Sequence, residues 1–318
     1  MRSRFRSRGV ALVTALLVVA IAASLAAFVA FGQQLWLRQM QNMSDRARAD
    51  SLERGAIAWA ASMFADDTNA SDNLGEVWAR PIPALPVPGG VIRGAVEDAQ
   101  ARFNLNNLWN GNAPSEPDIE AFRRLLVSVG ANPDLSQAVL DWIDPDSQTT
   151  PPGGAEDIDY LQMDPPYRAA NQPLASIDEL RLVRGFTPDL IEALRPFVTA
   201  NPVRTDVNVN TASPEVIAAL IPGLSAGQAK EMLVDRERAP FEDIAKFNER
   251  LPKEIVPPQA GLNVKTAYFL VMLDIVIGRH RRHTEALVAR SASAQASSMV
   301  WHRSQPLIVA TDETERDE

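Results

Sequence analysis

Residues Arg8 to Leu17 read RGVALVTALL, and from Val10 to Leu37 the chain carries no charged side chain. About 20 apolar residues are enough for a helix to cross a bilayer, so this run predicts a membrane-spanning helix over residues 10–31. The N-terminal arginines that precede it favour the cytoplasmic side of the membrane. We therefore expect a single-pass anchor with a cytoplasmic N-terminus and with the bulk of the chain outside the cytoplasm.

The start of the apolar run distinguishes between two kinds of anchor. An ordinary secretory signal has a core of roughly 7–15 apolar residues and a small-x-small cleavage site; the run here is longer and no such site follows it. A plain membrane anchor stays open as one interpretation. The other rests on Arg8-Gly9-Val10, which resembles the leader of type IV pilin-like proteins. In that family a prepilin peptidase cuts after the glycine and the new N-terminus is methylated, so the resemblance implies leader 1–9 and a cut between Gly9 and Val10.

Thr14 departs from the pilin-like pattern in an informative way. Most of that family has glutamate at the fifth mature position, where its carboxylate pairs with the N-terminal amine of the neighbouring subunit. A charge in apolar surroundings is tolerated only when it is paired. A subunit without that charge fits most simply at the tip of a fibre, where no neighbour lies above it. The alternative is that the chain is not pilin-like at all.

The helix is expected to continue past the membrane to about residue 66, which makes residues 10–65 a rod of about 85 Å. Its outer part carries an apolar stripe of helical period that can pack on a globular domain. The stripe consists of Leu52, Ala56, Trp59, Ala60 and Met63, and the charged residues Arg46, Arg48, Asp50, Glu53 and Arg54 lie off it. The polar run 66–69 is expected to end the helix.

Composition excludes several classes of function. The 318 residues include no cysteine, which rules out thiolate chemistry. They include only three histidines (His280, His283 and His302), which makes a multi-histidine metal centre unfavourable. The sequence offers no Ser-His-Asp arrangement either. A membrane-tethered hydrolase is therefore a weak rival, and we expect no enzyme. The net charge of −9 also disfavours nucleic-acid binding.

Strand and helix patterns predict an α+β fold. It has a long N-terminal transmembrane helix packed on a pilin-like antiparallel sheet, with a large inserted helical domain of helix-hairpin-helix or SAM-like type. Strands are expected over 91–96 and 268–277, with weaker candidates over 285–290 and 297–303, a strand end and turn over 102–108, and a loop over 81–90. The domains are accordingly the helix 10–66, a pilin-like α/β domain from 67–111 and 251–303, the insertion 112–250, and an acidic disordered tail 304–318.

The insertion contains an internal repeat. Residues 182–187 (LVRGFT) and 220–225 (LIPGLS) align, and each lies between two short helix patterns. Such units resemble helix-hairpin-helix modules, which bind DNA backbone through exposed amides. Thr187 and Ser225 stand near the place of the second hairpin glycine, and residues 174–250 carry 12 acidic against 9 basic side chains. We expect a protein-interaction module, and a membrane-anchored receptor for extracellular DNA remains the alternative function.

An acidic loop is the strongest candidate site. No lysine or arginine occurs from Leu125 to Tyr167, where eight carboxylates gather. Close carboxylates repel by about 1 kcal/mol per pair even in water, and a hard cation with roughly 6–8 oxygen ligands removes that repulsion. Calcium suits such an irregular loop better than magnesium. The spacing is not that of an EF-hand. The alternatives are a solvated acidic face and a glycosidase-like carboxylate pair, the latter without the aromatic residues of a sugar cleft.

Segments along most of the chain resemble the K-type minor pseudopilins of type II secretion systems. They are the RG-VALVTALLVVAI start and residues 103–106, 141–144, 154–157, 166–168, 171, 179–180 and 208–212. The resemblance implies an inner-membrane-anchored periplasmic subunit, processed by the prepilin peptidase. It would cap a short pseudopilus with the I- and J-type minor pseudopilins, above the other pseudopilus subunits, and help initiate its assembly for export of folded proteins across the outer membrane. It also implies calcium near the acidic loop, with Asp141, Asp144, Asp146, Glu156 and Asp157 as candidate ligands. No nucleic-acid partner is expected.

Overall fold

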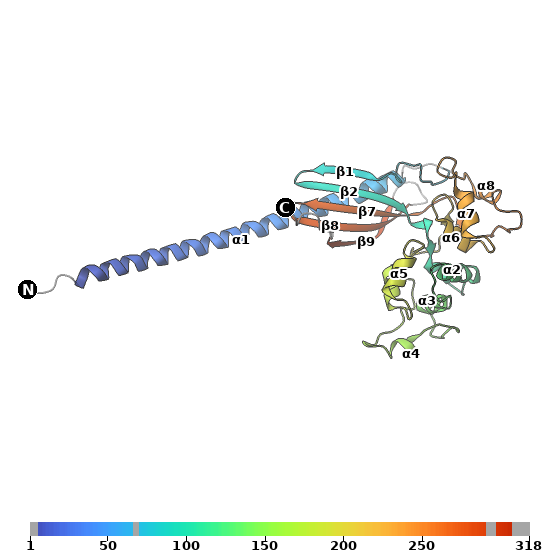
Figure 1. The fold of residues 1–318 in the computed structure, drawn as a ribbon, viewed down its shortest axis with the longest axis horizontal. Coiled ribbons are helices and arrows are strands. Elements are labelled where there is room, and N and C mark those ends of the chain that lie inside the picture. Colours follow the sequence, from blue (N-terminus) through green and yellow to red (C-terminus); the bar gives the residue numbers. More distant parts are fainter. Residues whose placement is uncertain (1–5, 66–69, 291–296, 307–318) are drawn as a thin grey trace, which may run out of the picture.

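A single helix of 60 residues dominates the shape of the molecule. The computed structural model describes residues 6–65, 70–290 and 297–306, and helix α1 spans Arg6–Ala65, a length of about 90 Å. Its N-terminal half projects away from the rest of the chain (Figure 1). Mean hydropathy reaches 2.7 there, so α1 is apolar enough to cross a bilayer. The helix begins four residues before Val10, within the predicted leader, and residues 66–69, expected to end it, lie outside the described residues.

The C-terminal part of α1 packs against one five-stranded sheet. The strands are β1 (Ile82–Val87), β2 (Gly90–Asp98), β7 (Tyr268–Ile277), β8 (His280–Ala289) and β9 (Ser298–Pro306). They lie in the order β1-β2-β7-β8-β9, and every neighbouring pair is antiparallel. This sheet and the helix on it confirm the predicted α+β class.

Two predictions at the edges of the sheet were wrong. Residues 81–90 were expected to form a loop, but β1 lies within them as an edge strand. Pro83 and Pro86 are tolerated there because an edge strand has one side whose N–H groups need no partner in the sheet. The tail was expected to start at residue 304, but β9 continues to Pro306. Residues 307–318 of the predicted tail lie outside the described residues.

The face that α1 packs on the sheet coincides in part with the predicted stripe: Ala60 is buried, and Leu52, Ala56 and Met63 are partly buried against the same core. Ala49, Glu53, Ile57, Ala60 and Phe64 are buried, whereas half of the Trp59 side chain is exposed. The Phe64 ring stacks on Phe269 of β7 with the ring centroids 4.1 Å apart. The buried face also includes Glu53, which was expected to face solvent, because its carboxylate is paired with Arg282 and so can be buried.

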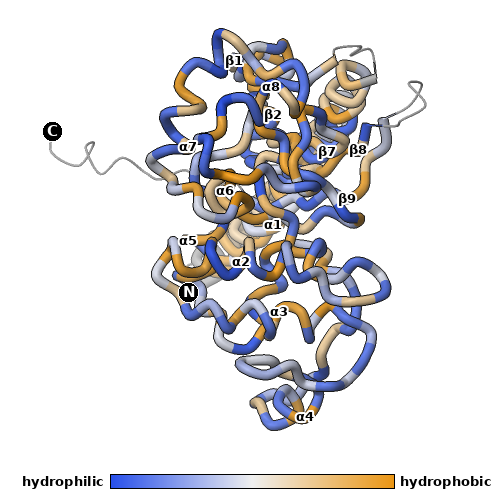
Figure 2. Tube along the Cα trace, turned by 90° about the vertical axis from the view of Figure 1, so that its right-hand side faces the viewer, coloured by the Kyte–Doolittle hydropathy of each residue, from blue (hydrophilic) through white to orange (hydrophobic). Residues whose placement is uncertain are grey.

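The helical unit is inserted between β2 and β7, which are neighbours in the sheet. Its elements, in chain order, are η1 (Ala99–Ala101), β3 (Phe103–Asn104), η2 (Leu105–Leu108), α2 (Glu116–Ser128), α3 (Leu135–Ile143), α4 (Asp157–Tyr160), η3 (Ile177–Leu182), α5 (Pro188–Leu194), β4 (Val198–Thr199), β5 (Val207–Asn208), α6 (Pro214–Leu220), α7 (Ala226–Leu233), α8 (Ile244–Asn248) and β6 (Leu262–Asn263). Figure 2 shows α2 to α5 forming a lobe apart from the sheet.

The unit is larger than the predicted 112–250. Phe103, Leu105 and Leu108 before this range, and Leu251 and Val264 after it, belong to the same hydrophobic core as α2 to α8. The sheet and α1 form a second, separate core. The predicted strand end and turn over 102–108 are present as β3 and η2. Their assignment to the pilin-like domain was wrong, because β3 pairs in parallel with β4 inside the helical unit and not with the sheet.

The helical unit consists of two halves that share one kind of contact. In each half an asparagine side chain hydrogen-bonds both the N–H and the carbonyl of one distant residue, and we call this contact the backbone clamp. In the first half, the Asn106 side chain accepts from the Leu174 N–H at 2.8 Å and donates to the Leu174 carbonyl at 3.0 Å. In the second, Asn210 makes the same two bonds to Phe241 at the same distances. Each half also closes with a short parallel strand pair, β3 with β4 and β5 with β6. This structural repeat aligns Asn106 with Asn210, and it is distinct from the predicted repeat of residues 182–187 and 220–225.

Both predicted hairpins are present within these halves. Gly185 and Gly223 have positive φ angles of 88° and 83°, which favour glycine. Thr187 and Ser225, near the place of the second hairpin glycine, are N-caps: their hydroxyl oxygens accept from the N–H groups of Leu190 and Gln228. Capping occupies amides that a DNA-binding hairpin would offer to phosphate.

Candidate metal centre

The acidic loop connects α3 to α4 and brings three carboxylates together. Asp144 follows the last residue of α3, Asp146 lies two residues further on, and Glu156 directly precedes α4. One oxygen of each lies within 4.8 Å of the others. Asp144 and Glu156 are 3% and 1% exposed, while Asp146 faces solvent. The result is a half-enclosed group of oxygen atoms at the tip of the helical lobe, where α4 lies in Figure 1.

Buried oxygens at this site lack partners within the described residues. They are Oδ1 of Asp144 and both Oε atoms of Glu156. A buried charged group without a hydrogen bond or counter-charge is strongly unfavourable. A hard cation satisfies all three oxygens at once, so the donor set fits calcium, which is bound by carboxylate and carbonyl oxygens.

The electrostatics of the loop show the same cost. Burial, together with the charges of Asp146 and Asp141, raises the pKa of Asp144 to about 6. Burial and the charges of Asp141 and Asp144 raise the pKa of Glu156 to about 7. Both shifts express the cost of holding negative charges close together away from water. A bound cation would reverse them.

Asp141 is also buried, but its carboxylate holds the loop in shape. Both oxygens lie within hydrogen-bond distance of the Thr150 N–H, at 3.0 and 3.3 Å. Burial raises its pKa. Gly154 packs against this contact so closely that a Cβ atom there would come within 2.2 Å of Asp141 Oδ2. Asp141 therefore fixes the turn between Asp146 and Glu156 and adds negative charge beside the cluster.

Asp157 points to different partners. Its oxygens accept from Arg168 Nη1 at 3.0 Å and from the Ala169 N–H at 3.1 Å. Of the five residues expected as ligands, the structure thus groups Asp144, Asp146 and Glu156, and it places Asp141 and Asp157 in contacts that support the loop.

Asn171 is a further oxygen donor that the ligand prediction omitted. Its N–H donates to the Trp142 carbonyl at 2.9 Å and its side-chain amide donates to the Asp146 carbonyl at 2.7 Å. Its Oδ1 is buried without a partner in the described part of the chain. The residue has a positive φ of 47°, a conformation for which asparagine is enriched. The signal that the sequence offered is that residue 171 is among the segments that carry the resemblance to K-type minor pseudopilins.

Aromatic packing and one arginine hold the loop on the hairpin of η3 and α5. Tyr160 packs edge-on against Trp142 and stacks on Tyr167, with ring centroids 5.1 and 5.3 Å apart. Arg184, from the hairpin, pairs with Asp159 at 2.5 Å and donates to the Gly154 carbonyl. The acidic cluster is thus mounted on a packed scaffold, as a specific ion site requires.

The position of the loop in the two-half architecture explains why it exists only once. In the second half, α7 ends at Leu233 and the clamped residue Phe241 follows soon after. In the first half, α3 ends at Ile143 and the clamped residue is Leu174. The acidic loop and α4 fill this longer connection. The first half therefore carries a site that the second half lacks the chain length to build.

Comparison with known proteins agrees with this division. Family models described as type II secretion system (T2SS), protein K match residues 101–203 and 207–265. A type II secretion system protein K of Pseudomonas aeruginosa is 34% identical over 288 residues, which cover 86% of each chain. The chain belongs to the type II secretion system protein K family. In this protein K chain the two matched ranges meet between β4 and β5, where the first clamped half ends and the second begins.

Further relatives extend the likeness over nearly the whole chain. The type II secretion system protein K of Aeromonas hydrophila is 32% identical over 310 residues, or 90% of this protein K chain and 93% of that relative. A chain in the crystal structure of the GspK-GspI-GspJ complex from the enterotoxigenic Escherichia coli type 2 secretion system superposes with a TM-score of 0.71. The two are 25% identical, and the match covers 86% of this chain and 99% of that one. These findings confirm the predicted family, and they give no support to the alternative of a DNA receptor.

Proposed function

We propose that this protein K chain is a minor pseudopilin held in the bacterial inner membrane by α1, with its N-terminus in the cytoplasm and its bulk in the periplasm. The apolar, unburied N-terminal part of α1 supports a single membrane span. The arginines before Gly9 support the orientation. Protease digestion of spheroplasts should remove the globular part, and its resistance to protease would contradict this orientation.

The proposed role is to cap the pseudopilus tip together with I- and J-type minor pseudopilins and to help start its assembly. The observation that carries this role is the likeness to a chain of the GspK-GspI-GspJ complex over 86% of the sequence. The wide helical unit lies at the end of the molecule opposite the N-terminus of α1 (Figure 1), where it would obstruct a further subunit. The Thr14 hydroxyl lies 3.1 and 3.0 Å from the carbonyl oxygens of Val10 and Ala11, within its own helix, and so needs no partner from a neighbouring subunit.

Co-purification tests this role. The full-length chain is co-expressed with the I- and J-type pseudopilins of the same genome, and the membranes are then solubilised in detergent. We expect all three proteins to elute as one complex. A second preparation without the J-type subunit is the control for non-specific association of apolar helices in detergent, which would not depend on that subunit. A chain that elutes alone under all these conditions would remove the tip assignment.

Processing between Gly9 and Val10 is part of the same proposal. We expect the prepilin peptidase to remove residues 1–9 and the new N-terminal Val10 to be methylated, which intact-mass spectrometry of the membrane protein detects. Gly9→Leu should leave the precursor mass, whereas Gly32→Leu, further along the same helix, should mature normally. Maturation of the Gly9→Leu variant to the mass of the processed parent would contradict the proposal.

The metal centre is proposed as a structural calcium site, and the protein as a structural subunit without catalytic activity. Asp144, Asp146 and Glu156, with the side-chain oxygen Oδ1 of Asn171 as a further donor, would hold the ion, which would supply positive charge that orders the loop. Removal of calcium from the purified chain should lower the Tm, and calcium should restore it whereas sodium should not. An unchanged Tm and no calcium by elemental analysis would refute the site.

A further inference from the structure

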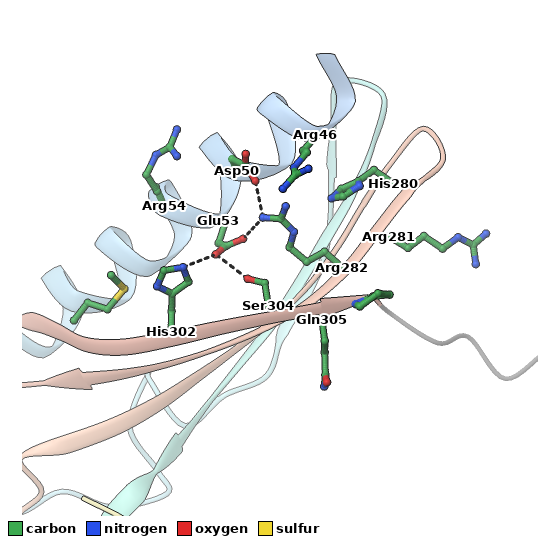
Figure 3. A pocket seen from close by; sticks show the side chains of 12 residues that line it. Arg46, Asp50, Glu53, Arg54, His280, Arg281, Arg282, His302, Ser304 and Gln305 are labelled. Carbon is green, nitrogen blue, oxygen red and sulfur yellow. Dashed lines mark hydrogen bonds and ion pairs between the residues drawn. The ribbon is translucent and has the colours of Figure 1, made fainter. Parts of the chain in front are cut away.

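A positively charged pocket lies at the end of the sheet from which the N-terminal half of α1 projects. It has a volume of about 560 Å³ and is bounded by α1, the start of β8 and the end of β9 (Figure 3). Four arginines line it against two carboxylates, Asp50 and Glu53. Arg282 is already paired with both carboxylates. The arginines of the pocket therefore outnumber its carboxylates, and the pocket has a net positive charge.

The unneutralised charge is carried mainly by α1. Arg46 and Arg54 are exposed and project from α1 in Figure 3, and neither has an ion pair within the described residues. His280, at the other side of the pocket, has a buried Nε2 atom without a hydrogen-bond partner in the same part of the chain. Arg54 Nη2 donates only to the Ser51 hydroxyl, at 3.4 Å. Two guanidinium groups without a counter-charge and one unsatisfied imidazole nitrogen are the features of a site for carboxylates.

The chain itself supplies a segment of the required charge. Strand β9 ends at Pro306, which lines the pocket. Residues 307–311 follow, and then DETERDE from Asp312 to Glu318, with five acidic residues and one arginine. Six residues reach about 20 Å when extended, so the acidic segment can reach the whole pocket. We propose that the pocket formed by α1, β8 and β9 binds the acidic segment Asp312–Glu318 of the same chain.

The covalent connection makes this contact favourable although its single ion pairs are weak. Exposed ion pairs contribute little individually, but a short linker holds the segment at an effective concentration of roughly millimolar. The bound segment connects β9 to α1 beside Glu53 and Arg282. It also covers the arginines of α1 at the point where the helix leaves the globular part. This inference is independent of the calcium site and of the tip assignment.

Disulfide trapping tests the contact directly, because the chain contains no cysteine. Met299 lines the pocket and is 49% exposed, so Met299→Cys combined with Thr314→Cys places one thiol at the pocket and one in the acidic segment. We expect the full-length chain in detergent to form the internal disulfide under mild oxidation. At about 1 M salt, where the Debye length falls to roughly 3 Å, the rate should drop.

Arginine variants separate binding from random encounter of the connected thiols. Adding Arg46→Gln and Arg54→Gln should slow disulfide formation by about fivefold or more, because only the contribution of random encounter then remains. Arg238→Gln and Arg250→Gln remove the same charge from exposed positions of the helical unit and should leave the rate unchanged. Equal rates in the Arg46/Arg54 variant and its parent overturn the proposal. Failure to trap the disulfide in the chain alone overturns it too, and leaves the pocket to an acidic segment of a partner.

Discussion

Glu53 of α1 and Arg282 of β8 form a buried ion pair, with Glu53 Oε2 and Arg282 Nη1 2.6 Å apart. Glu53 is 5% exposed. Asp50 lies 2.6 Å from the same guanidinium nitrogen, and the Ser304 hydroxyl on β9 donates to Glu53 Oε1 at 3.2 Å. One carboxylate thus connects the helix with two strands, at the polar pocket that α1 forms with β8 and β9 (Figure 3).

Removing one member of this pair should cost more than removing both. Arg282→Met leaves Glu53 buried without its counter-charge, which typically costs about 3–5 kcal/mol. The double variant Glu53→Met/Arg282→Met removes the buried carboxylate as well, and it leaves without a partner only Asp50, whose side chain is 37% exposed and therefore hydrated. It should recover most of the loss. Thermal melting of the full chain in detergent measures both. Arg281→Met, at an exposed neighbouring position, is the control and should melt like the parent. A double variant less stable than Arg282→Met would contradict this account.

The fold was predictable where local pattern and tertiary context agree. Strand β7 alternates buried and partly exposed residues from Tyr268 to Ile277, and the sequence predicted these bounds. The burial of Glu53 on α1 was not predictable, because it depends on Arg282, more than two hundred residues away. The strand Phe103–Asn104 was assigned to the wrong unit for the same reason: its partner, β4, is distant in sequence.

Ligand substitutions should separate the residues of the acidic cluster from those that support the loop. Glu156→Gln and Asp144→Asn each remove a charge with at least one buried oxygen that lacks a partner in the described residues, so we expect calcium affinity to fall at least tenfold. Asp157→Asn removes a charge already paired with Arg168 and should change affinity much less. Isothermal titration of the calcium-stripped full chain measures all three. Comparable losses in all three variants would mean that Asp157 also binds the ion.

The composition of the site was predictable, but its geometry was not. A stretch of carboxylates without a lysine or arginine indicated a cation site from sequence alone. Which carboxylates meet depends on the turn that Asp141 and Thr150 hold, and on the ion pair that directs Asp157 towards Arg168. Asn171 reaches the loop through backbone contacts to Trp142 and Asp146, which no spacing rule predicts.

The pH dependence of stability should have opposite signs without and with calcium. In the metal-free protein the pKa values of Asp144 and Glu156, about 6 and about 7, lie above their ordinary values. Their stabilising contribution is therefore complete below about pH 4 and is lost as pH rises through 6 and 7. Calcium needs both groups ionised, so its stabilisation should appear over the same range.

Melting curves of calcium-stripped protein, recorded from about pH 5 to about pH 8 with and without added calcium, measure this effect. The difference in Tm between the two series should be near zero at the acidic end and several degrees at the alkaline end. Glu156→Gln should flatten the metal-free series, because the group that titrates near 7 is gone. A calcium-induced shift in Tm that is the same at every pH would show that protons and calcium do not compete for the carboxylates of Asp144 and Glu156.

Gly154→Ala should damage the site without touching any ligand. A Cβ at this position would lie 2.2 Å from Asp141 Oδ2 and 2.4 Å from the Thr150 carbonyl oxygen, so the turn must open. Forcing an extra methyl group into such a packed region typically costs about 1–3 kcal/mol. Because the same turn carries Glu156 to Asp144 and Asp146, calcium affinity should fall together with Tm. Gly227→Ala, within α7 where a Cβ has room, is the matched control and should be neutral or slightly stabilising. A Gly154→Ala variant that binds calcium like the parent would show that the turn does not position the carboxylates.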